Sequence, residues 1–335
     1  MNALDPLRDL WSGLALQSRN VFSTWEWAWT WWRYFGDGRV LDVAVISGRR
    51  DEPIAVLPLY RRRLGLATLL RFVGHGPADE LGPVAAPEAG SDAMKALGDV
   101  LDRERSAVFV GDRLSMGTPY GRIGARVVAS AVTPVLQFET RDWDSYLASR
   151  SANFRQELRR KERRIAEAGG RFRLSIPETL SGDLDALFML HRERWEGTRT
   201  GFDERAAFHR DFALIASERG WLRLWFLELD GEPAAAWLGF RFASVEAYYQ
   251  AGRARRFDPL SPGLVLLAHS VREAQADGMG EYRFLRGDEG FKRRFADAEP
   301  TVQTVVAARG TVARWALAAA VRGGVASRMI ANRLR

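Results

Sequence analysis

The pattern of apolar and polar positions is most informative between Tyr248 and Phe295. It predicts a helix there, because apolar residues recur three and four positions apart, the spacing of a stripe that packs on a sheet: Leu264, Leu267, Ala268 and Val271. Ser261 and Pro262 precede this helix and Gly278 ends it. The stretch therefore reads as a strand, a loop, a helix, a second strand and a charged turn into another helix.

Similar patterns divide the remainder of the chain into two α/β segments. The first, from Asp5 to about Glu139, contains an aromatic helix, a second helix at 91–103 and four strand-like apolar runs at 41–46, 54–59, 107–110 and 127–128. The second begins after residue 140 with a basic helix, followed by a strand, two helices, a hairpin around Asp230-Gly231 and the stretch described above. Because 335 residues suffice for two cores, we expect domains at 1–139 and 140–308 and a tail at 309–335.

The aromatic helix contains five tryptophans between Trp25 and Trp32. Trp25, Trp29 and Trp32 share one helical face, which predicts an aromatic face packed under a sheet. A platform on which sugars stack is the functional alternative.

The start of the helix after Ser261 has the features of an anion site. Ser261 is a candidate N-cap, Pro262 fixes the first turn, and Gly263 has no side chain to cover the backbone N–H groups at the positive end of the helix dipole. Such a place can hold a pyrophosphate. One glycine is not diagnostic of a phosphate loop, so a capped helix without a ligand stays open as the alternative.

Composition excludes several kinds of chemistry. The chain has no cysteine, which removes disulfides, thiolate metal sites and a cysteine nucleophile, and its four histidines are scattered without metal-site spacing. We therefore expect no metal. The N-terminal segment has no secretory pattern, and no stretch approaches the roughly 18 uninterrupted apolar residues of a membrane span. A cytoplasmic location is expected.

The net charge of +7 is concentrated at the C-terminus. Residues 301–335 contain six arginines and no acid, leaving 43 basic and 42 acidic residues in the body, a balance that argues against nucleic acid as a partner. Apolar residues between the arginines of the tail suit a helix on an anionic membrane surface, which predicts peripheral contact at the inner face of the membrane. A helix docked on the protein's own core is the alternative.

Three sequence segments together resemble a known family. They are the Tyr-rich strand followed by D-P-x-x-S-P-G and Y-x-F-L-R-G-D-E-x-x-K-R-R-F, the basic helix SANFRQELRRKERRIAEAG, and the aromatic segment FSTWEWAWTWWRYFG. This combination resembles the CelD-like acyltransferase family associated with cellulose and exopolysaccharide biosynthesis, part of the GNAT superfamily and similar to the Fem-type peptidyltransferases. The resemblance spans roughly residues 20 to 300. It implies an α/β (α+β) architecture of tandem GNAT-like domains, with mixed sheets flanked by helices.

The resemblance implies an acyl donor, acetyl-coenzyme A or another acyl-coenzyme A, whose pyrophosphate would be held by Ser261, Pro262, Gly263 and Leu264. The backbone around 248–251 would polarise the thioester carbonyl. Catalytic candidates are Asp288 as general base, with Tyr249 nearby, and Lys292, which could hold the substrate's anion or pair with Asp288. A helix cap at Asp288 is the structural alternative. Phe291 stands where the family usually has Tyr, so no proton transfer is expected from that position.

Four further residues are candidates for substrate binding. Arg155 and Arg159, one turn apart on the basic helix, could grip an anionic group, although most charges of this helix are expected to form a solvated face. His75 and Asp79 lie in the loop 74–83, which could line a cleft or be a plain surface turn.

The favoured function is an acyl-coenzyme A-dependent N-acyltransferase acting on a small-molecule or glycan-precursor amine in polysaccharide or cell-envelope metabolism. The family resemblance alone supplies that pathway. A Fem-like transferase that uses aminoacyl-tRNA and a non-catalytic GNAT-like scaffold at the membrane are the alternatives.

Overall fold

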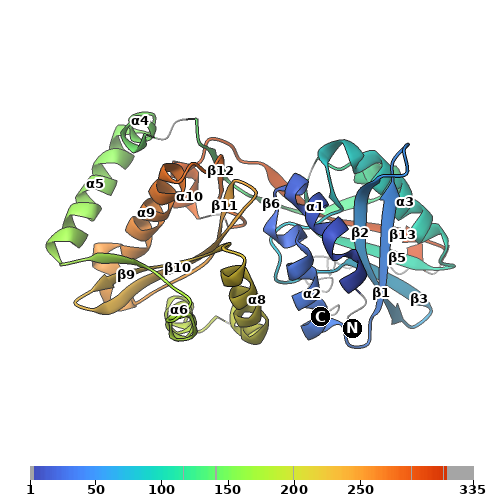
Figure 1. The fold of residues 1–335 in the computed structure, drawn as a ribbon, viewed down its shortest axis with the longest axis horizontal. Helices are drawn as coiled ribbons and strands as arrows, with labels where there is room; N and C mark the ends of the chain where they lie inside the picture. The colour runs from blue at the N-terminus through green and yellow to red at the C-terminus, as the bar shows by residue number, and fades with distance from the viewer. Residues whose placement is uncertain are drawn as a thin grey trace. The chain divides into compact units, whose positions relative to one another are not determined.

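The computed structural model describes residues 4–115, 117–139, 142–198, 200–287, 289–311 and 313–314. The chain forms two compact units, Met1–Val132 with Thr301–Arg335 and Thr133–Pro300 (Figure 1). Each is built around its own mixed sheet.

The described part of the first unit has a seven-stranded sheet in the order β1-β2-β3-β5-β13-β6, with β4 paired to β2. Helices α1 and α2 lie on one side of this sheet and α3 on the other (Figure 1). The strands are β1 (Val40–Ser47), β2 (Pro53–Leu64), β3 (Ala67–Phe72), β4 (Val84–Ala85), β5 (Ala107–Ser115), β6 (Arg126–Val132) and β13 (Thr301–Arg309). The helices are η1 (Asp5–Leu7), α1 (Arg8–Ser18), η2 (Val21–Ser23), α2 (Trp25–Phe35), η3 (Pro87–Ala89), α3 (Gly90–Asp102) and η4 (Tyr120–Ile123).

The aromatic helix is α2, and the face that it buries differs from the predicted one. Thr24 caps the helix by accepting the Trp27 N–H at 3.2 Å. Trp27 and Trp31, one turn apart, are fully buried, and Trp31 stacks on Tyr60 of β2 with 5.3 Å between ring centroids. Of the predicted face, Trp25 is buried, whereas Trp29 and Trp32 are only partly buried. The prediction was wrong because the tryptophans occupy more than one face of the helix, so their spacing does not select the buried one.

The described part of the second unit has a six-stranded sheet in the order β7-β12-β11-β10-β9-β8. Helices α5, α9 and α10 lie on one side of it and α6 and α8 on the other (Figure 1). The strands are β7 (Val135–Gln137), β8 (Arg171–Leu174), β9 (Leu222–Leu229), β10 (Glu232–Phe242), β11 (Val245–Arg253) and β12 (Glu281–Arg283). The helices are α4 (Trp143–Ala148), α5 (Ala152–Glu167), α6 (Leu180–Arg194), α7 (Gly201–Glu204), α8 (Ala206–Glu218), η5 (Arg255–Leu260), α9 (Pro262–Ala276) and α10 (Gly290–Phe295).

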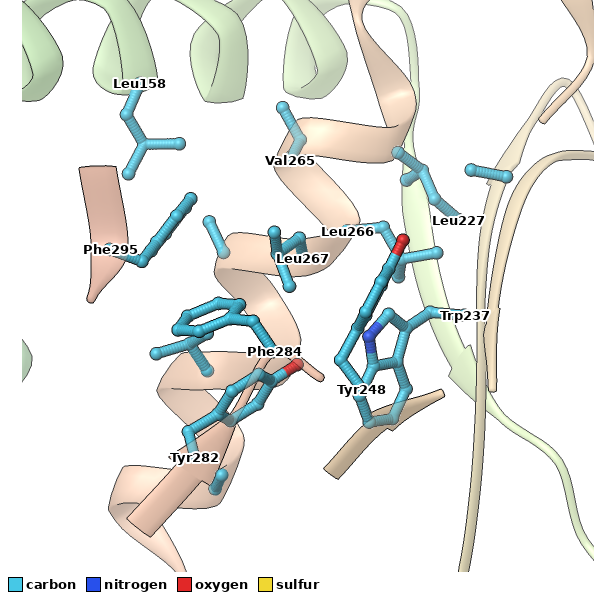
Figure 2. Close-up of a cluster of buried hydrophobic side chains, with 14 of the residues drawn as sticks. Leu158, Leu227, Trp237, Tyr248, Val265, Leu266, Leu267, Tyr282, Phe284 and Phe295 are labelled. Atoms are coloured by element: carbon cyan, nitrogen blue, oxygen red, sulfur yellow. The ribbon is translucent and has the colours of Figure 1, made fainter. Parts of the chain in front are cut away.

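The core of the second unit lies between α9 and the sheet (Figure 2). The rings of Trp237, Tyr248 and Tyr282 meet aliphatic side chains from α9. The Tyr282 hydroxyl is buried but satisfied, because it lies 2.8 Å from the Ser270 hydroxyl. This core fixes α9 against β11 and β12 and thereby positions the residues discussed below.

The boundaries of the two units differ from the predicted domains. β13 pairs antiparallel with β5 and β6, so residues 301–309 complete the first sheet and do not belong to a second domain ending at 308. β7, in turn, pairs with β12 and lies in the second unit. The alternating pattern of a strand does not say which sheet it joins, and this is why the sequence placed β13 in the wrong unit. Most of the predicted tail, 315–335, lies outside the described residues.

In the parts of the chain that the structure describes, no helix combines the length and apolar character needed to cross a bilayer. The same residues contain no group of three or more His, Asp or Glu side chains arranged to hold a metal ion.

Candidate active site at a strand fork

The two parallel strands of the second unit diverge and form a fork. β11 and β12 pair only through 245–247 and 281–283, after which β11 continues to Arg253 without a β12 partner. The chain leaves β12 because the Phe284 N–H donates to the Pro134 carbonyl at 2.9 Å and Leu285 takes a left-handed conformation with φ 52°. Backbone of β11 beyond Ala247 is therefore not covered by a neighbouring strand on this side.

A β-bulge lies at the point where the strands diverge. Along β11, Tyr248 pairs with Gly239 and Gln250 pairs with Leu238, so that Tyr249 is an extra residue in the ladder. Tyr248 packs with the α9 cluster, whereas Tyr249 contacts rings on the other side of the sheet: Phe202, His209 and Phe240. The bulge thus bends the strand at the fork and re-aims the side chains that follow.

Charged side chains connect the two arms of the fork. Lys292 of α10, only 2% exposed, donates to the Arg286 carbonyl at 2.8 Å and lies 2.9 Å from Glu289. Arg194 of α6 lies 3.7 Å from the other oxygen of Glu289 and donates to the Ala251 carbonyl at 3.4 Å. The loop after β12 is therefore tied to the end of β11 through Glu289.

The predicted catalytic residues do not form one cluster. Lys292 lies at the fork with its ammonium 5.1 Å from the centre of the Tyr248 ring. Tyr249 is buried on the opposite face of β11, so the structure does not bring it to Lys292. Asp288 lies outside the described residues, and its role stays a prediction. The carboxylate that contacts Lys292 in the described residues is Glu289.

The start of α9 lies at the end of the η5 turn that follows β11. Ser261 is left-handed (φ 57°, ψ 50°) and its side chain makes no capping bond, so the predicted cap is wrong. Ser261 is also the residue that ends η5, and a left-handed conformation is common at the end of a helix. The Leu264 and Val265 N–H groups donate to the Ser261 carbonyl, whereas Gly263 has open space where a side chain would be, the nearest atom being Arg253 Cδ at 3.8 Å from a Cβ. No side chain therefore covers the backbone of Gly263 from that direction.

Three arginines lie at the end of β11 and the beginning of η5, the segments that precede this helix start in the chain. Each is paired with a carboxylate: Arg253 with Asp258, Arg255 with Glu196, and Arg256 with Glu232. These are exposed or half-exposed pairs, which are worth little in water and can exchange partners with an anionic ligand. These arginines could not be recognised from the sequence, because their spacing matches no phosphate motif.

The predicted arginines of the basic helix have different environments. Arg155 donates to the Ala148 carbonyl at 3.1 Å and to the Arg150 carbonyl, so it holds the end of α4. Arg159 is exposed on α5. Neither is brought to the fork by a described contact.

His75 and Asp79 belong to the first unit. His75 Nδ1 lies 3.2 Å from the Tyr60 hydroxyl, its carbonyl accepts the Trp31 indole N–H at 2.8 Å, and Asp79 lies 3.6 Å from Arg113. The structure does not place them with the other candidates, which are all in the second unit.

The first unit has a comparable pair of diverging parallel strands, β3 and β5, which pair through 68–70 and 107–109. Here the chain itself fills the opening. Leu81 forms a parallel bridge with Leu114, its N–H donates to the Arg113 carbonyl at 3.0 Å, and Ala78 is fully buried beneath the same loop. The fork of the second unit is therefore the better candidate for holding a ligand.

A buried carboxylate lies on β11 before the fork. Glu246 is fully buried, and one of its oxygens is bound by Arg241 at 2.6 Å while the other has no hydrogen-bond partner among the described residues. Burial raises the pKa of Glu246 to about 7, although Arg241 opposes the shift. Arg241 also binds Asp277 at the end of α9, so this network joins β10, β11 and α9.

Glu246 is expected to make stability depend on pH. A carboxyl with a raised folded-state pKa contributes stability that is complete below its ordinary pKa of 4.5 and is lost as pH rises through about 7. The free energy of unfolding of wild type relative to Glu246→Gln should fall by on the order of 2–3 kcal/mol between about pH 5 and about pH 8. Urea unfolding of both proteins across this range measures it. A difference that does not change with pH would show that Glu246 does not titrate there.

Several residues of the fork were not found from the sequence. Arg194 and His191 lie on α6, whose pattern indicated only a helix, and Gln250 carried no motif. The G-D-E-x-x-K segment was the usable signal for Glu289 and Lys292, since it places the two three residues apart at a helix start.

Comparisons with known proteins bear on the fold and the family. Residues 152–293 match the family model described as an acetyltransferase (GNAT) domain. The search of curated proteins found no match. Among solved structures, FemX is similar with a TM-score of 0.64 at 13% identity, covering 89% of this chain and 95% of that one. L-PGS from Bacillus licheniformis is similar with a TM-score of 0.56 at 12% identity, covering 90% and 97%.

A conserved protein of unknown function from Bacteroides thetaiotaomicron is also similar, with a TM-score of 0.58 at 13% identity and coverage of 92% and 98%. At such identities these likenesses concern the fold, which is a tandem GNAT fold. The fork with its bulge, the helix that starts beside it and the matched segment all lie in the second unit. Residues 152–293 are thus an acetyltransferase (GNAT) domain, and this match confirms the resemblance to the CelD-like family.

Proposed function

We propose that the second unit transfers an acyl group, acetyl in the simplest case, from acyl-coenzyme A to an amine in polysaccharide or cell-envelope metabolism. The observation that carries this proposal is the fork of β11 and β12 with a bulge at Tyr249 and the start of α9 beside it. The donor supplies an activated thioester. The amine nitrogen attacks its carbonyl carbon, the carbon–sulfur bond breaks, coenzyme A leaves as the thiol, and one proton leaves the amine.

The residues present fit an anionic donor at the start of α9. A side chain at Gly263 would have open space, with Arg253 Cδ as the nearest atom at 3.8 Å, and Arg253 is held in an exposed pair with Asp258. With a pyrophosphate bound, Arg253 would exchange Asp258 for a doubly charged partner. The pyrophosphate would also accept a hydrogen bond from the Gly263 N–H, at the positive end of a 15-residue helix. Uncovered β11 backbone beyond Ala247 supplies hydrogen-bonding groups for an extended ligand between the arms of the fork.

A carboxylate in the segment after β12 would act as the general base that removes the amine proton. Glu289 is poorly suited, since both of its oxygens are already paired, one with Arg194 and the other with Lys292. Its role is to hold the two arms of the fork together. Asp288, the neighbouring carboxylate, is the proposed proton acceptor.

Donor binding is tested by thermal unfolding with acetyl-coenzyme A, longer acyl-coenzyme A and aminoacyl-tRNA. A ligand at about 100 times its dissociation constant stabilises the folded state by about 2.7 kcal/mol. Turnover with a panel of amino sugars is followed as free thiol, and the absence of cysteine means that the protein adds no thiol background. Stabilisation by aminoacyl-tRNA alone would favour a Fem-like donor, and no response to any donor would contradict the proposal.

Gly263→Asp is expected to weaken acetyl-coenzyme A binding by at least about tenfold, because it places a negative charge beside the pyrophosphate. The fold should tolerate it, since Asp is favourable in the first turn of a helix. Gly182→Asp is the matched control, at an early position of α6 with no atom within 4 Å of its Cβ. Isothermal titration calorimetry compares the two variants. Equal weakening, or none, would remove Gly263 from the donor site.

A further inference from the structure

The hairpin of β2 and β3 in the first unit ends in an exposed apolar tip, Leu64–Leu66. Leu64 pairs with Ala67, so the strands are joined by the two-residue turn Gly65-Leu66. Gly65 supplies the positive φ, 59°, that such a turn needs at its first position. Leu64 is 38% exposed and Leu66 is 79% exposed, the largest value of any large apolar side chain in the described residues. A polar residue could form the same turn, so turn geometry does not account for the leucines.

Three consecutive arginines of β2 directly precede the hairpin tip. Because side chains alternate along a strand, Arg61 and Arg63 lie on one face of the sheet and Arg62 lies on the other. Arg61 is paired with Asp42 and with Glu104, each at 3.2 Å. Arg62 and Arg63 contact no carboxylate in the parts of the chain that the structure describes. Positive charge therefore flanks the apolar tip on both faces of the hairpin.

A hollow of about 440 Å³ lies beside the hairpin. Val40, which is 59% exposed, lines it together with Arg62 and Arg63. Glu104 lines it as well, but its carboxylate is paired with Arg61. The hollow thus offers an anionic group a place between cationic and apolar side chains.

The tail of the chain begins at the base of the same hairpin. The Thr68 N–H donates to the Ser106 carbonyl at 2.9 Å, and the Ser106 hydroxyl accepts the Ala313 N–H at 3.1 Å. Residues 315–335, whose arginines and apolar positions suit an anionic membrane surface, therefore continue from this end of the first unit.

Other segments at this end of the unit add positive charge. The loop before β1 precedes Val40, which pairs with Arg61, and the turn after α3 carries Glu104. Apart from Glu104, the segments 37–39, 102–106 and 309–314 contain five arginines and two acids: Arg39, Arg103, Arg105, Arg309 and Arg314 against Asp37 and Asp102. Charge complementarity thus favours an anionic partner.

We propose that the hairpin tip docks the first unit on an anionic lipid bilayer. Leu64 and Leu66 enter the boundary of the acyl chains, and Arg62 and Arg63 lie at the level of the lipid phosphates. A bilayer provides both layers, whereas nucleic acid or an acidic protein surface supplies the negative charge without an apolar layer behind it. Only one turn enters the boundary, so the backbone groups at its base remain among hydrated headgroups.

Co-sedimentation of the full chain with vesicles tests the proposal. Binding to vesicles of phosphatidylglycerol and phosphatidylcholine should exceed binding to phosphatidylcholine alone and should weaken as salt is raised, because exposed charges are screened. Leu66→Ser should weaken binding to the anionic vesicles by about tenfold, because it removes the apolar side chain and keeps the turn. Leu214→Ser, at a 47% exposed leucine of α8 in the second unit, is the matched control and should bind like wild type.

Two results of this experiment would overturn the proposal. One is a wild-type protein that does not bind the anionic vesicles. The other is equal binding of Leu66→Ser and wild type, which would assign the affinity to a different part of the chain, such as the tail.

A single dye locates the contact, because the chain has no cysteine of its own. Leu64→Cys, labelled with an environment-sensitive fluorophore, keeps Leu66 in place. Its emission should increase and shift to the blue with anionic vesicles, and the same label on Leu214→Cys should not respond. A label at position 64 that does not respond while the protein sediments with the vesicles would overturn the proposal. A label already shielded without vesicles would overturn it too, since the tail would then cover the hairpin tip.

Discussion

Gly252→Ala is expected to lower the free energy of unfolding by about 3 kcal/mol, because a methyl group at this position overlaps the α6 backbone. Backbone atoms cannot rotate away as a flexible side chain can, so helix and strand must separate. Urea unfolding of the variant and wild type measures the loss. The displaced helix carries His191 and Arg194, and the fork should lose its order together with the stability.

Gly182→Ala is the matched control for this prediction. Gly182 lies on α6, the helix that Gly252 contacts, and a Cβ at Gly182 meets nothing within 4 Å. Alanine is the better helix former, and this variant should be as stable as wild type or more stable by up to about 1 kcal/mol. If Gly252→Ala unfolded like Gly182→Ala, the close contact between α6 and β11 would be refuted.

Asp288→Asn is expected to reduce kcat by about 10²- to 10⁴-fold, because the variant cannot accept the amine proton. The affinity for acetyl-coenzyme A should stay within about twofold of wild type, since this carboxylate is not assigned to the donor. Release of coenzyme A thiol with saturating donor measures the rate.

Asp297→Asn serves as the control for a carboxylate of the same unit. Asp297 binds Arg150 and accepts the Gln137 N–H, and its removal should leave kcat unchanged. A rate in Asp288→Asn equal to that of wild type would exclude Asp288 as the general base and leave proton transfer to water.

Local sequence signals predicted much of the second unit. The helices at Ala152–Glu167 and Pro262–Ala276 begin and end close to the predicted positions, because caps, proline and glycine act within one turn of the helix. The hairpin of β9 and β10 turns at Asp230 and Gly231, both left-handed, as a two-residue turn requires. The tandem GNAT fold followed from the family resemblance and is confirmed.

Features that depend on contacts distant in sequence could not be predicted. β13 joins β5 across almost 200 residues of chain, and nothing within Thr301–Arg309 specifies that partner. The bulge at Tyr249 exists only relative to β10. The role of Gly252 becomes visible only when α6 is placed on β11, since glycine in a strand pattern has several explanations.

The candidate site was predicted in part for the same reason. Lys292 and the turn at Gly263 came from motifs and lie at the fork and at the helix start beside it. Ser261 was assigned a capping bond that its left-handed backbone does not make. His75 and Asp79 were predicted to bind substrate because they share one loop. The structure places them in the first unit, where the chain itself fills the opening between β3 and β5.

Hydrogen exchange with saturating acetyl-coenzyme A tests the central claim most directly. Binding in the fork of the second unit predicts slower exchange of backbone amides at 248–253 and 263–265, with no change at 77–81 in the first unit. Protection confined to the first unit, or saturation without protection of the β11 amides, would contradict the account.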